Sequence, residues 1–176
     1  MNINPIPEST IEFISPFDFK SMYDLGNKKT GKIPYSIYYR ELGIEYDSID
    51  LNGKDGALKL DLTKPIDLKP RDVVMNLGTS EHILNQEAVF RNIHNLSNYR
   101  MIHQVPIKGS RPGHGYWGYT YRFFKMLAVI NDYEIIKMEF EERRQIICVS
   151  FKHILKTNFK WDRNLLNLFE GTFLAS

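Results

Sequence analysis

The stretch Asp72-Val73-Val74-Met75-Asn76-Leu77-Gly78-Thr79-Ser80-Glu81-His82 decides the fold class of this 176-residue chain. It opens with a run whose β-branched, apolar centre is typical of a strand buried in a parallel sheet. Polar residues follow at once, and we expect Ser80 to cap a long helix in which Val89, Ile93 and Leu96 repeat at helical spacing. A buried strand, a glycine turn and a helix in this order predict one unit of a layered α/β protein.

The segments on both sides of this stretch alternate between strand and helix patterns. We predict further strands at 22–25, 46–51, 57–62, 101–105, 133–140 and 145–151, and further helices at 34–42 and around 124–128. The charged turn Glu141-Glu142-Arg143-Arg144 joins the last two strands and predicts an antiparallel hairpin. The sequence therefore predicts one domain, residues 1–176, with a mainly parallel α/β sheet that ends in this hairpin. We expect residues 1–20 to form an N-terminal arm and residues 157–176 a closing helix.

The composition is that of a globular protein with a core of its own. Hydrophobic residues make up 43% of the chain and charged residues 25%, with a formal net charge of +2. Because no Lys/Arg face stands out, nucleic acid is not an expected partner. No segment has the pattern of a signal peptide or a membrane span, so we expect a cytoplasmic protein without membrane contact. The single cysteine, Cys148, lies in an apolar run and is predicted to fill the core; a homo-oligomer is left open.

Polar residues gather at four predicted strand ends, and the fourth of these is the segment 76–82 quoted above. The carboxyl ends of parallel strands meet at one edge of a sheet, and ligands bind there. The first three strand ends carry Asp24 with Gly26, then Asp50, then Asp61. A glycine lets the backbone approach a ligand closely, and Asp50 is placed to accept both hydroxyls of a ribose. Asp50 and Asp61 are also typical turn residues, which is the structural alternative for each of them.

Two blocks resemble a branch of the class I methyltransferase superfamily. The segment 72–86 contains an Asn-x-Gly-Thr-x-Glu-His pattern that is similar to the block after the fourth strand of that branch. His103-Gln104-Val105-Pro106 and Gly113-His114-Gly115-Tyr116-Trp117-Gly118-Tyr119 are similar to the end of its fifth strand and the following loop. The resemblance covers about 22–151. It implies a three-layer Rossmann-like sheet of the class I methyltransferase type, S-adenosylmethionine (SAM) as cofactor and a small-molecule methyl acceptor as partner.

The resemblance also implies cofactor contacts at each strand end. The implied contacts are Asp24 and Gly26 with the methionine part, Asp50 with the ribose, Asp61 and Leu62 with the adenine, and Asn76, Gly78 and Thr79 along the methyl-transfer face. One departure from the family is the first loop, Asp24-Leu25-Gly26-Asn27-Lys28-Lys29-Thr30-Gly31, which carries lysines where small residues are usual.

A methyl acceptor must be positioned and must lose a proton, so the site needs a general base. Histidine titrates in the useful range, and we favour His114 because glycines flank it in a loop that can close over an acceptor. The alternative is that Gly113-His114-Gly115 is only a tight turn. Glu81 and His82 are predicted either to take part directly or to orient the helix. A metal site of Glu81, His82 and His103 lacks a diagnostic spacing, and no metal is predicted.

His103, Trp117 and Tyr119 are predicted to line the acceptor pocket, although aromatic residues ahead of a helix are as often core. Two functions remain open. The first is a SAM-dependent methyltransferase that modifies an oxygen or nitrogen of a small molecule such as a sugar or related metabolite. The second is a catalytically degenerate module of the same fold that serves binding or assembly. A first loop packed shut by Lys28 or Lys29 would favour the module, and an open cleft beside Asp50 would favour the enzyme.

Overall fold

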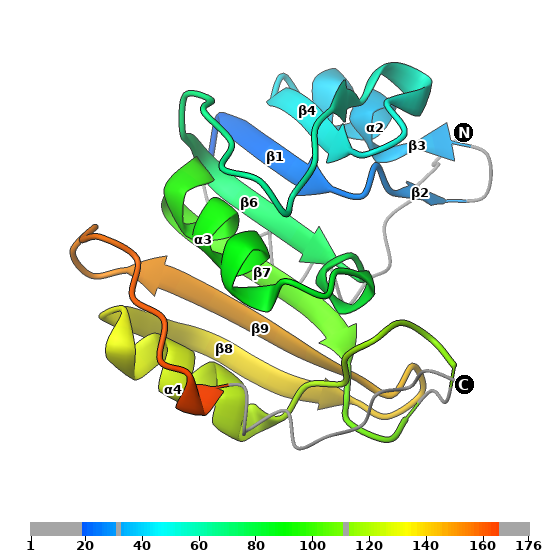
Figure 1. Cartoon of the computed structure of the whole chain (residues 1–176). Coiled ribbons are helices and arrows are strands. Elements are labelled where there is room, and N and C mark those ends of the chain that lie inside the picture. The colour runs from blue at the N-terminus through cyan, green and yellow to red at the C-terminus, as the bar shows by residue number, and fades with distance from the viewer. Residues whose placement is uncertain (1–18, 31–32, 111–112, 166–176) are drawn as a thin grey trace.

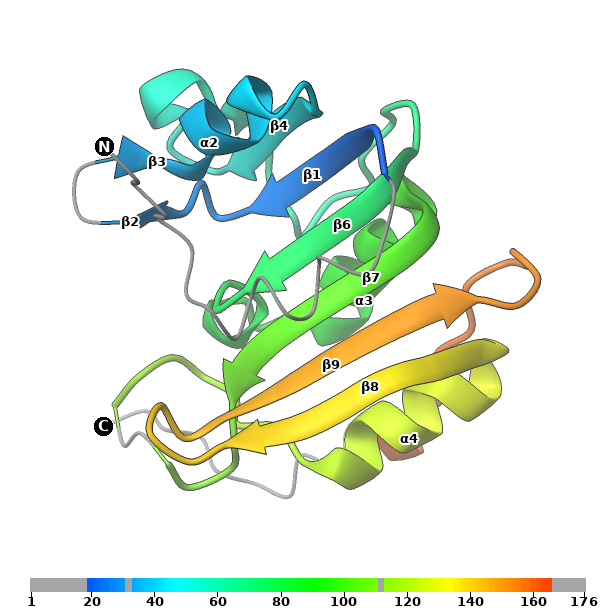
Figure 2. The ribbon, with the colours of Figure 1, turned by 180° about the vertical axis from the view of Figure 1, so that it is seen from behind.

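The computed structural model of the protein describes residues 19–30, 33–110 and 113–165. Its centre is a seven-stranded sheet in the order β5-β4-β1-β6-β7-β9-β8 (Figures 1 and 2). The strands are β1 (Ser21–Leu25), β4 (Glu45–Asp50), β5 (Leu58–Lys59), β6 (Arg71–Leu77), β7 (Ser97–Pro106), β8 (Tyr133–Glu141) and β9 (Ile146–His153). The first five of these run parallel, whereas β9 is antiparallel to both β7 and β8. The predicted mainly parallel sheet with a C-terminal hairpin is confirmed.

Helices cover both faces of the sheet and give the predicted three layers. Figure 1 shows α3 (Gln86–Leu96) and α4 (Tyr121–Ile130) on the face turned to the viewer, while α2 (Tyr35–Glu41) packs by β4. Successive side chains of β6 point to opposite faces of the sheet, so the protein has one hydrophobic core on each face. Val74 packs with the residues of α3 and α4 on one face, and Val73 packs with the buried tyrosines of α2 on the other. Cys148 is buried in the α2-side core, as predicted.

The start of α3 differs from the prediction. Ser80 opens a short 3-10 turn, η2 (Ser80–His82), and the helix begins only at Gln86. Its cap is Asn85, whose side chain accepts a hydrogen bond from the Ala88 N–H at 3.1 Å. Ser80 cannot serve as the cap because its hydroxyl accepts from the Asn76 amide and from Tyr119 instead. This short turn holds the two residues that follow Ser80, Glu81 and His82, at the edge of the sheet.

The two outer strands of the sheet, β5 and β8, are its least regular parts. The predicted strand 57–62 is reduced to the two residues of β5, and no helix joins it to β6 in the described chain. At the other edge, the ladder between β8 and β9 is irregular between Ile135 and Lys137. Two small elements, β2 (Lys29–Thr30) and β3 (Ile33–Pro34), pair apart from the main sheet, and η1 (Lys54–Gly56) follows β4. The predicted arm lies almost entirely outside the described residues. Of the predicted closing helix, 157–163 are not helical, 164 and 165 are helical, and 166–176 lie outside the described residues.

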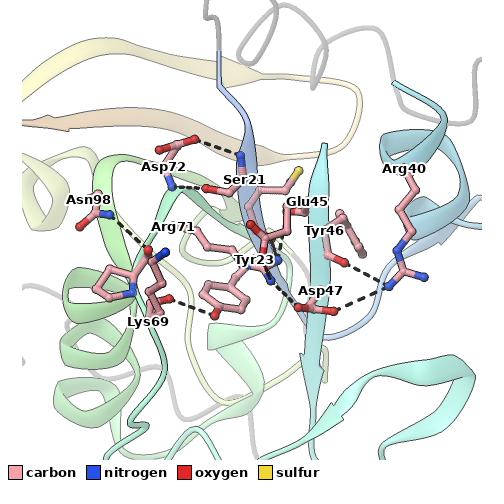
Figure 3. Close-up of polar contacts among 12 residues, drawn as sticks. Ser21, Tyr23, Arg40, Glu45, Tyr46, Asp47, Lys69, Arg71, Asp72 and Asn98 are labelled. Atoms are coloured by element: carbon pink, nitrogen blue, oxygen red, sulfur yellow. Dashed lines mark hydrogen bonds and ion pairs between the residues drawn. The ribbon is translucent and has the colours of Figure 1, made fainter. Parts of the chain in front are cut away.

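Arg71 ties together the amino ends of three strands (Figure 3). Its guanidinium donates to the carbonyls of Met22 at 2.8 Å and Glu45 at 3.0 Å, and to the carboxylates of Glu45 and Asp47. It also lies 4.3 Å from the centre of the Tyr23 ring. This amino edge is therefore held by a charged group whose donors meet acceptors within the chain.

Candidate functional site

A pocket of about 520 Å³ lies at the carboxyl ends of β1, β4, β5 and β6. We call it the larger pocket. It is lined by Gly26, Lys28, Ile49, Asp50, Leu51, Leu60, Asp61, Leu62, Thr63, Gly78, Thr79, His82, Ile83, Leu84 and Tyr116. Six of the eight predicted cofactor residues are in this lining, and Asp24 and Asn76 are not. The strand ends thus meet at one edge, as the predicted topology requires.

Gly26 contributes its backbone to the lining of the larger pocket. Gly26 has a φ of +87°, and a Cβ there would lie 2.2 Å from the Thr79 hydroxyl oxygen. That hydroxyl donates to the Leu25 carbonyl at 2.6 Å, and the Gly26 N–H donates to the Ile49 carbonyl at 2.8 Å. The ends of β1, β4 and β6 are tied together without a side chain from Gly26 entering the pocket.

The two carboxylates of the lining have structural partners as well. Asp50 Oδ1 accepts from the Asn52 N–H at 2.8 Å, and Asp61 Oδ1 accepts from both the N–H and the hydroxyl of Thr63 at 2.8 Å. These bonds to Thr63 lower the pKa of Asp61. Both residues therefore stabilise turns and also line the pocket, so the two interpretations of each are compatible.

Asp24 and Asn76 lie outside the pocket lining and bond the loops that form it. Asp24 is fully buried, and its Oδ2 accepts from the Lys28 N–H at 2.9 Å and the Tyr46 hydroxyl at 2.8 Å. Burial raises the pKa of Asp24 to about 6, and its Oδ1 has no hydrogen-bond partner among the described residues. Asn76 bonds the N–H and hydroxyl of Ser80 and contacts His103 Nδ1 at 3.2 Å. Both residues fix the positions of the loops that form the pocket.

The lysines of the first loop point in different directions. Lys28 Nζ donates to the Gly78 carbonyl at 2.7 Å, which places this ammonium in the wall of the larger pocket. Lys29 pairs with Asp55 and is absent from the lining. The larger pocket thus remains open beside Asp50, and Lys28 forms part of its side.

A second pocket of about 260 Å³ adjoins the larger one and shares Lys28 and Gly78 with it. Its lining is Lys28, Tyr35, Leu77, Gly78, Glu81, Gln104, Pro106, His114, Arg144 and Ile146. Tyr35 of α2 and Arg144 of the hairpin turn were not among the predicted site residues. Their elements come to this edge only through the tertiary fold, and neither residue belongs to a motif.

Glu81, His82 and His114 meet between the two pockets. Glu81 Oε1 lies 3.8 Å from His82 Nε2 and 3.6 Å from His114 Nε2, and the two rings meet edge to face. The Glu81 carbonyl accepts the Tyr116 N–H at 2.7 Å, which docks the loop that carries His114. The pKa of His82 is lowered by burial first, and by the nearby His114 and Lys28 next. The three predicted catalytic residues are therefore neighbours.

The three predicted acceptor residues do not line either pocket. His103 is 1% exposed, and burial lowers its pKa to about 3. The Trp117 indole donates to the Ile83 carbonyl at 3.0 Å, and the Tyr119 hydroxyl bonds Ser80 and Gln86 at 2.7 Å each. These contacts are structural. The aromatic residue of this loop that lines the larger pocket is Tyr116.

Several solved structures that are similar to this chain are methyltransferases. The 1,6-didemethyltoxoflavin-N1-methyltransferase of Burkholderia thailandensis, solved with S-adenosylhomocysteine (SAH), aligns over 85% of this chain and 77% of its own, with 12% identity and a TM-score of 0.64. The magnesium protoporphyrin IX methyltransferase of Synechocystis PCC 6803, solved with SAM, aligns over 83% and 77%, with 13% identity and a TM-score of 0.60. The N-methyltransferase NodS of Bradyrhizobium japonicum WM9, solved with SAH, aligns over 83% and 84%, with 7% identity and a TM-score of 0.60.

The fold is therefore the class I methyltransferase fold, as the resemblance implied. No family model matches the sequence, and no curated protein sequence matches it either. Within the described residues, every helix is too short or too polar to cross a bilayer. Location in the cytoplasm stays a prediction.

Proposed function

We propose that this protein is a SAM-dependent methyltransferase that modifies an oxygen or nitrogen of a small molecule. The observation that carries the proposal is the larger pocket, which lies at the carboxyl edge of the sheet and has Asp50, Gly26 and Leu62 in its lining. Its volume of about 520 Å³ is in the range of ligand sites, which span roughly 300–1,000 Å³. Neighbours of the same fold carry SAM or SAH, which supports this choice of ligand.

The residues present fit the chemistry of the cofactor. Leu60 and Leu62 offer apolar contact for adenine, and Asp50 offers a carboxylate for the ribose hydroxyls. Gly26 contributes backbone to the lining, and its φ of +87° and its contact with Thr79 leave no room for a side chain at this position. When bound, SAM supplies an electrophilic methyl group on a sulfonium. The chain's part is to bind it, to keep water away and to hold the acceptor.

The second pocket is the proposed acceptor site. It shares Gly78 and Lys28 with the larger pocket, and its volume of about 260 Å³ suits a small molecule. Its lining includes Gln104, His114 and Arg144, which are side chains that bind polar groups. In this proposal His114 Nε2 takes the proton of the acceptor, and Glu81 Oε1 at 3.6 Å stabilises the imidazolium that forms. A sugar or related metabolite fits this polar lining.

One observation favours the alternative, a degenerate module for binding or assembly. Lys28 places a cation in the wall of the larger pocket, bonded to the Gly78 carbonyl. A cation there opposes a sulfonium more than it opposes the neutral sulfur of SAH. The open pocket beside Asp50 supports the enzyme, and measured binding decides between the two.

Calorimetry with SAM and with SAH tests the proposal directly. We expect both to bind the wild-type chain and Asp50→Ala to weaken each by about tenfold to a hundredfold, since hydrogen bonds to a charged group contribute about 1.5–3 kcal/mol. The matched control is Asp67→Ala, because Asp67 is exposed and absent from the lining of either pocket. If neither ligand binds at roughly millimolar concentration, the upper range of enzyme KM values, the methyltransferase proposal is wrong and the module remains.

A further inference from the structure

The cluster of Glu81, His82 and His114 offers three metal-ligand atoms in one place. The carboxylate oxygen and the two imidazole nitrogens all lie within 4.8 Å of one another. Two of them belong to η2 and the third to the loop after β7, so segments some 30 residues apart converge here. The carboxylate is 1% exposed, whereas the His82 and His114 side chains are 49% and 43% exposed.

The distances within the cluster suit an ion better than direct hydrogen bonds. The oxygen of Glu81 lies 3.8 Å from His82 Nε2 and 3.6 Å from His114 Nε2, beyond the usual reach of N–H···O bonds. Ligand atoms about 2.0–2.2 Å from one tetrahedral ion are about 3.3–3.6 Å apart. Small rotations of the two half-exposed imidazoles would bring the three atoms to that spacing around the fixed carboxylate.

The backbone around the cluster is fixed. The Glu81 carbonyl accepts the N–H groups of Tyr116 at 2.7 Å and Trp117 at 3.2 Å. Gly115 allows this approach, because a Cβ there would lie 2.8 Å from the same carbonyl oxygen. His114 is thus held beside Glu81 by contacts that do not involve its own ring.

The cluster also lies where a bound ion could contact a small molecule in either pocket. His82 lines the larger pocket, while Glu81 and His114 line the second pocket. Three protein ligands leave at least one coordination position for another molecule, as in catalytic metal sites. Lys28 and Arg144 are the cations in the adjoining linings that oppose a metal ion. The Lys28 ammonium is engaged by the Gly78 carbonyl at 2.7 Å, and the Arg144 guanidinium donates to the Glu141 carboxylate.

We propose that Glu81, His82 and His114 bind one divalent transition-metal ion between the two pockets. Two imidazoles with one carboxylate favour Zn²⁺, Mn²⁺, Fe²⁺ or Co²⁺ over Ca²⁺ and Mg²⁺, which prefer all-oxygen sites. The catalytic meaning of the ion rests on the proposed function, although its binding does not. With the ion present, His114 is a ligand, and the ion rather than a free imidazole favours the deprotonated form of an acceptor oxygen in the second pocket. This points to an acceptor with a hydroxyl group.

Titration of the tag-free chain with Co²⁺, followed by its visible absorption and by metal analysis, tests the site. We expect one Co²⁺ per chain, displaced by Zn²⁺, and at least about a hundredfold weaker binding for both His82→Ala and His114→Ala, which remove half-exposed side chains. Glu81→Gln should weaken binding as well, with circular dichroism to check that the variant folds. Glu87→Gln changes a half-exposed carboxylate on α3 that is absent from the cluster, and it should leave Co²⁺ binding unchanged.

Two outcomes overturn the metal site: no Co²⁺ bound at roughly millimolar concentration, or binding that survives His114→Ala. Calorimetry with SAM and SAH on the same samples separates this result from the proposed function. Co²⁺ binding without SAM or SAH binding leaves the metal site standing and removes the methyltransferase proposal. Binding of SAM or SAH without Co²⁺ does the reverse, and His114 then remains the proposed base.

Discussion

The two edges of the central sheet use polar side chains in opposite ways. At the amino edge, Arg71 donates to two carbonyls and two carboxylates of the neighbouring strands (Figure 3). At the carboxyl edge, Asp50 and Asp61 line a pocket of about 520 Å³, and His82 and His114 are half-exposed beside Glu81. Polar groups that meet partners within the chain contribute to stability, whereas polar groups that face a pocket are available to a ligand.

The largest expected effect is loss of stability when the amino edge is broken. Arg71→Met removes a guanidinium whose side chain is 9% exposed and leaves the Asp47 carboxylate and two carbonyls without it. Each buried acceptor left without its donor costs about 1–3 kcal/mol, so the loss of two carbonyl partners and of the pair with the part-exposed Asp47 should lower the free energy of unfolding by about 3–5 kcal/mol. Urea unfolding would measure this as a lower midpoint at an unchanged slope. Arg40→Met is the control, because Arg40 is exposed and its pair with Asp47 should contribute less than about 1 kcal/mol. Equal losses in both variants would contradict the contrast between the edges.

The ionisation of Asp24 should change the free energy of unfolding with pH by up to about 3 kcal/mol. Its pKa rises from 3.8 to about 6 on burial, so the folded chain holds a proton that the unfolded chain releases between these values. The stability from this group is complete below about pH 4 and is lost as the pH rises through about 6. Asp24→Asn removes this titration and keeps an acceptor for the Lys28 N–H.

The unfolding free energy of Asp24→Asn minus that of the wild type should therefore increase with pH through this window. Urea unfolding at several pH values measures the difference, and Asp67→Asn, at an exposed position, should give a flat one. A difference for Asp24→Asn that is flat or falls with pH would mean that the buried carboxyl does not hold its proton.

The smallest expected effect is a change of ligand preference at Lys28. Lys28→Met removes the ammonium from the wall of the larger pocket. If the proposed function holds, SAM should gain about 1 kcal/mol relative to SAH, roughly fivefold, because only SAM carries a positive sulfonium. Calorimetry with both ligands gives the ratio. Lys29→Met should leave it unchanged, since Lys29 pairs with Asp55 outside the pocket, and an unchanged ratio in Lys28→Met would place the ammonium too far from the sulfur to matter.

The sequence predicted the central strands and missed the loops for a physical reason. Strand β6 and helix α4 were predictable because their own residues carry the apolar pattern. The prediction of Ser80 as the cap of α3 was wrong, because Asn76 and Tyr119, which only the tertiary fold brings to Ser80, bond its hydroxyl.

The same limit applies to the site. Aspartates and glycines at strand ends were found, since topology alone brings strand ends together. His114 was predicted with Glu81 and His82 and lies beside them, because the loop after β7 folds back onto the Glu81 carbonyl. His103 was predicted in the acceptor pocket but is buried in the core. Likewise Tyr116 rather than Tyr119 reaches the larger pocket. Such choices among neighbouring residues of one loop depend on backbone hydrogen bonds that no spacing reveals.

The irregular outer strands bear on how copies of this chain can associate. An exposed strand invites another chain to extend the sheet and so to aggregate. Strand β5 has only two residues, and β8 is interrupted between Ile135 and Lys137 and carries Glu134, Lys137 and Glu139. Short length, a bulge and alternating charge all disfavour the addition of a strand. The described outer strands therefore disfavour a homo-oligomer that extends the sheet and favour one that forms through side-chain surfaces.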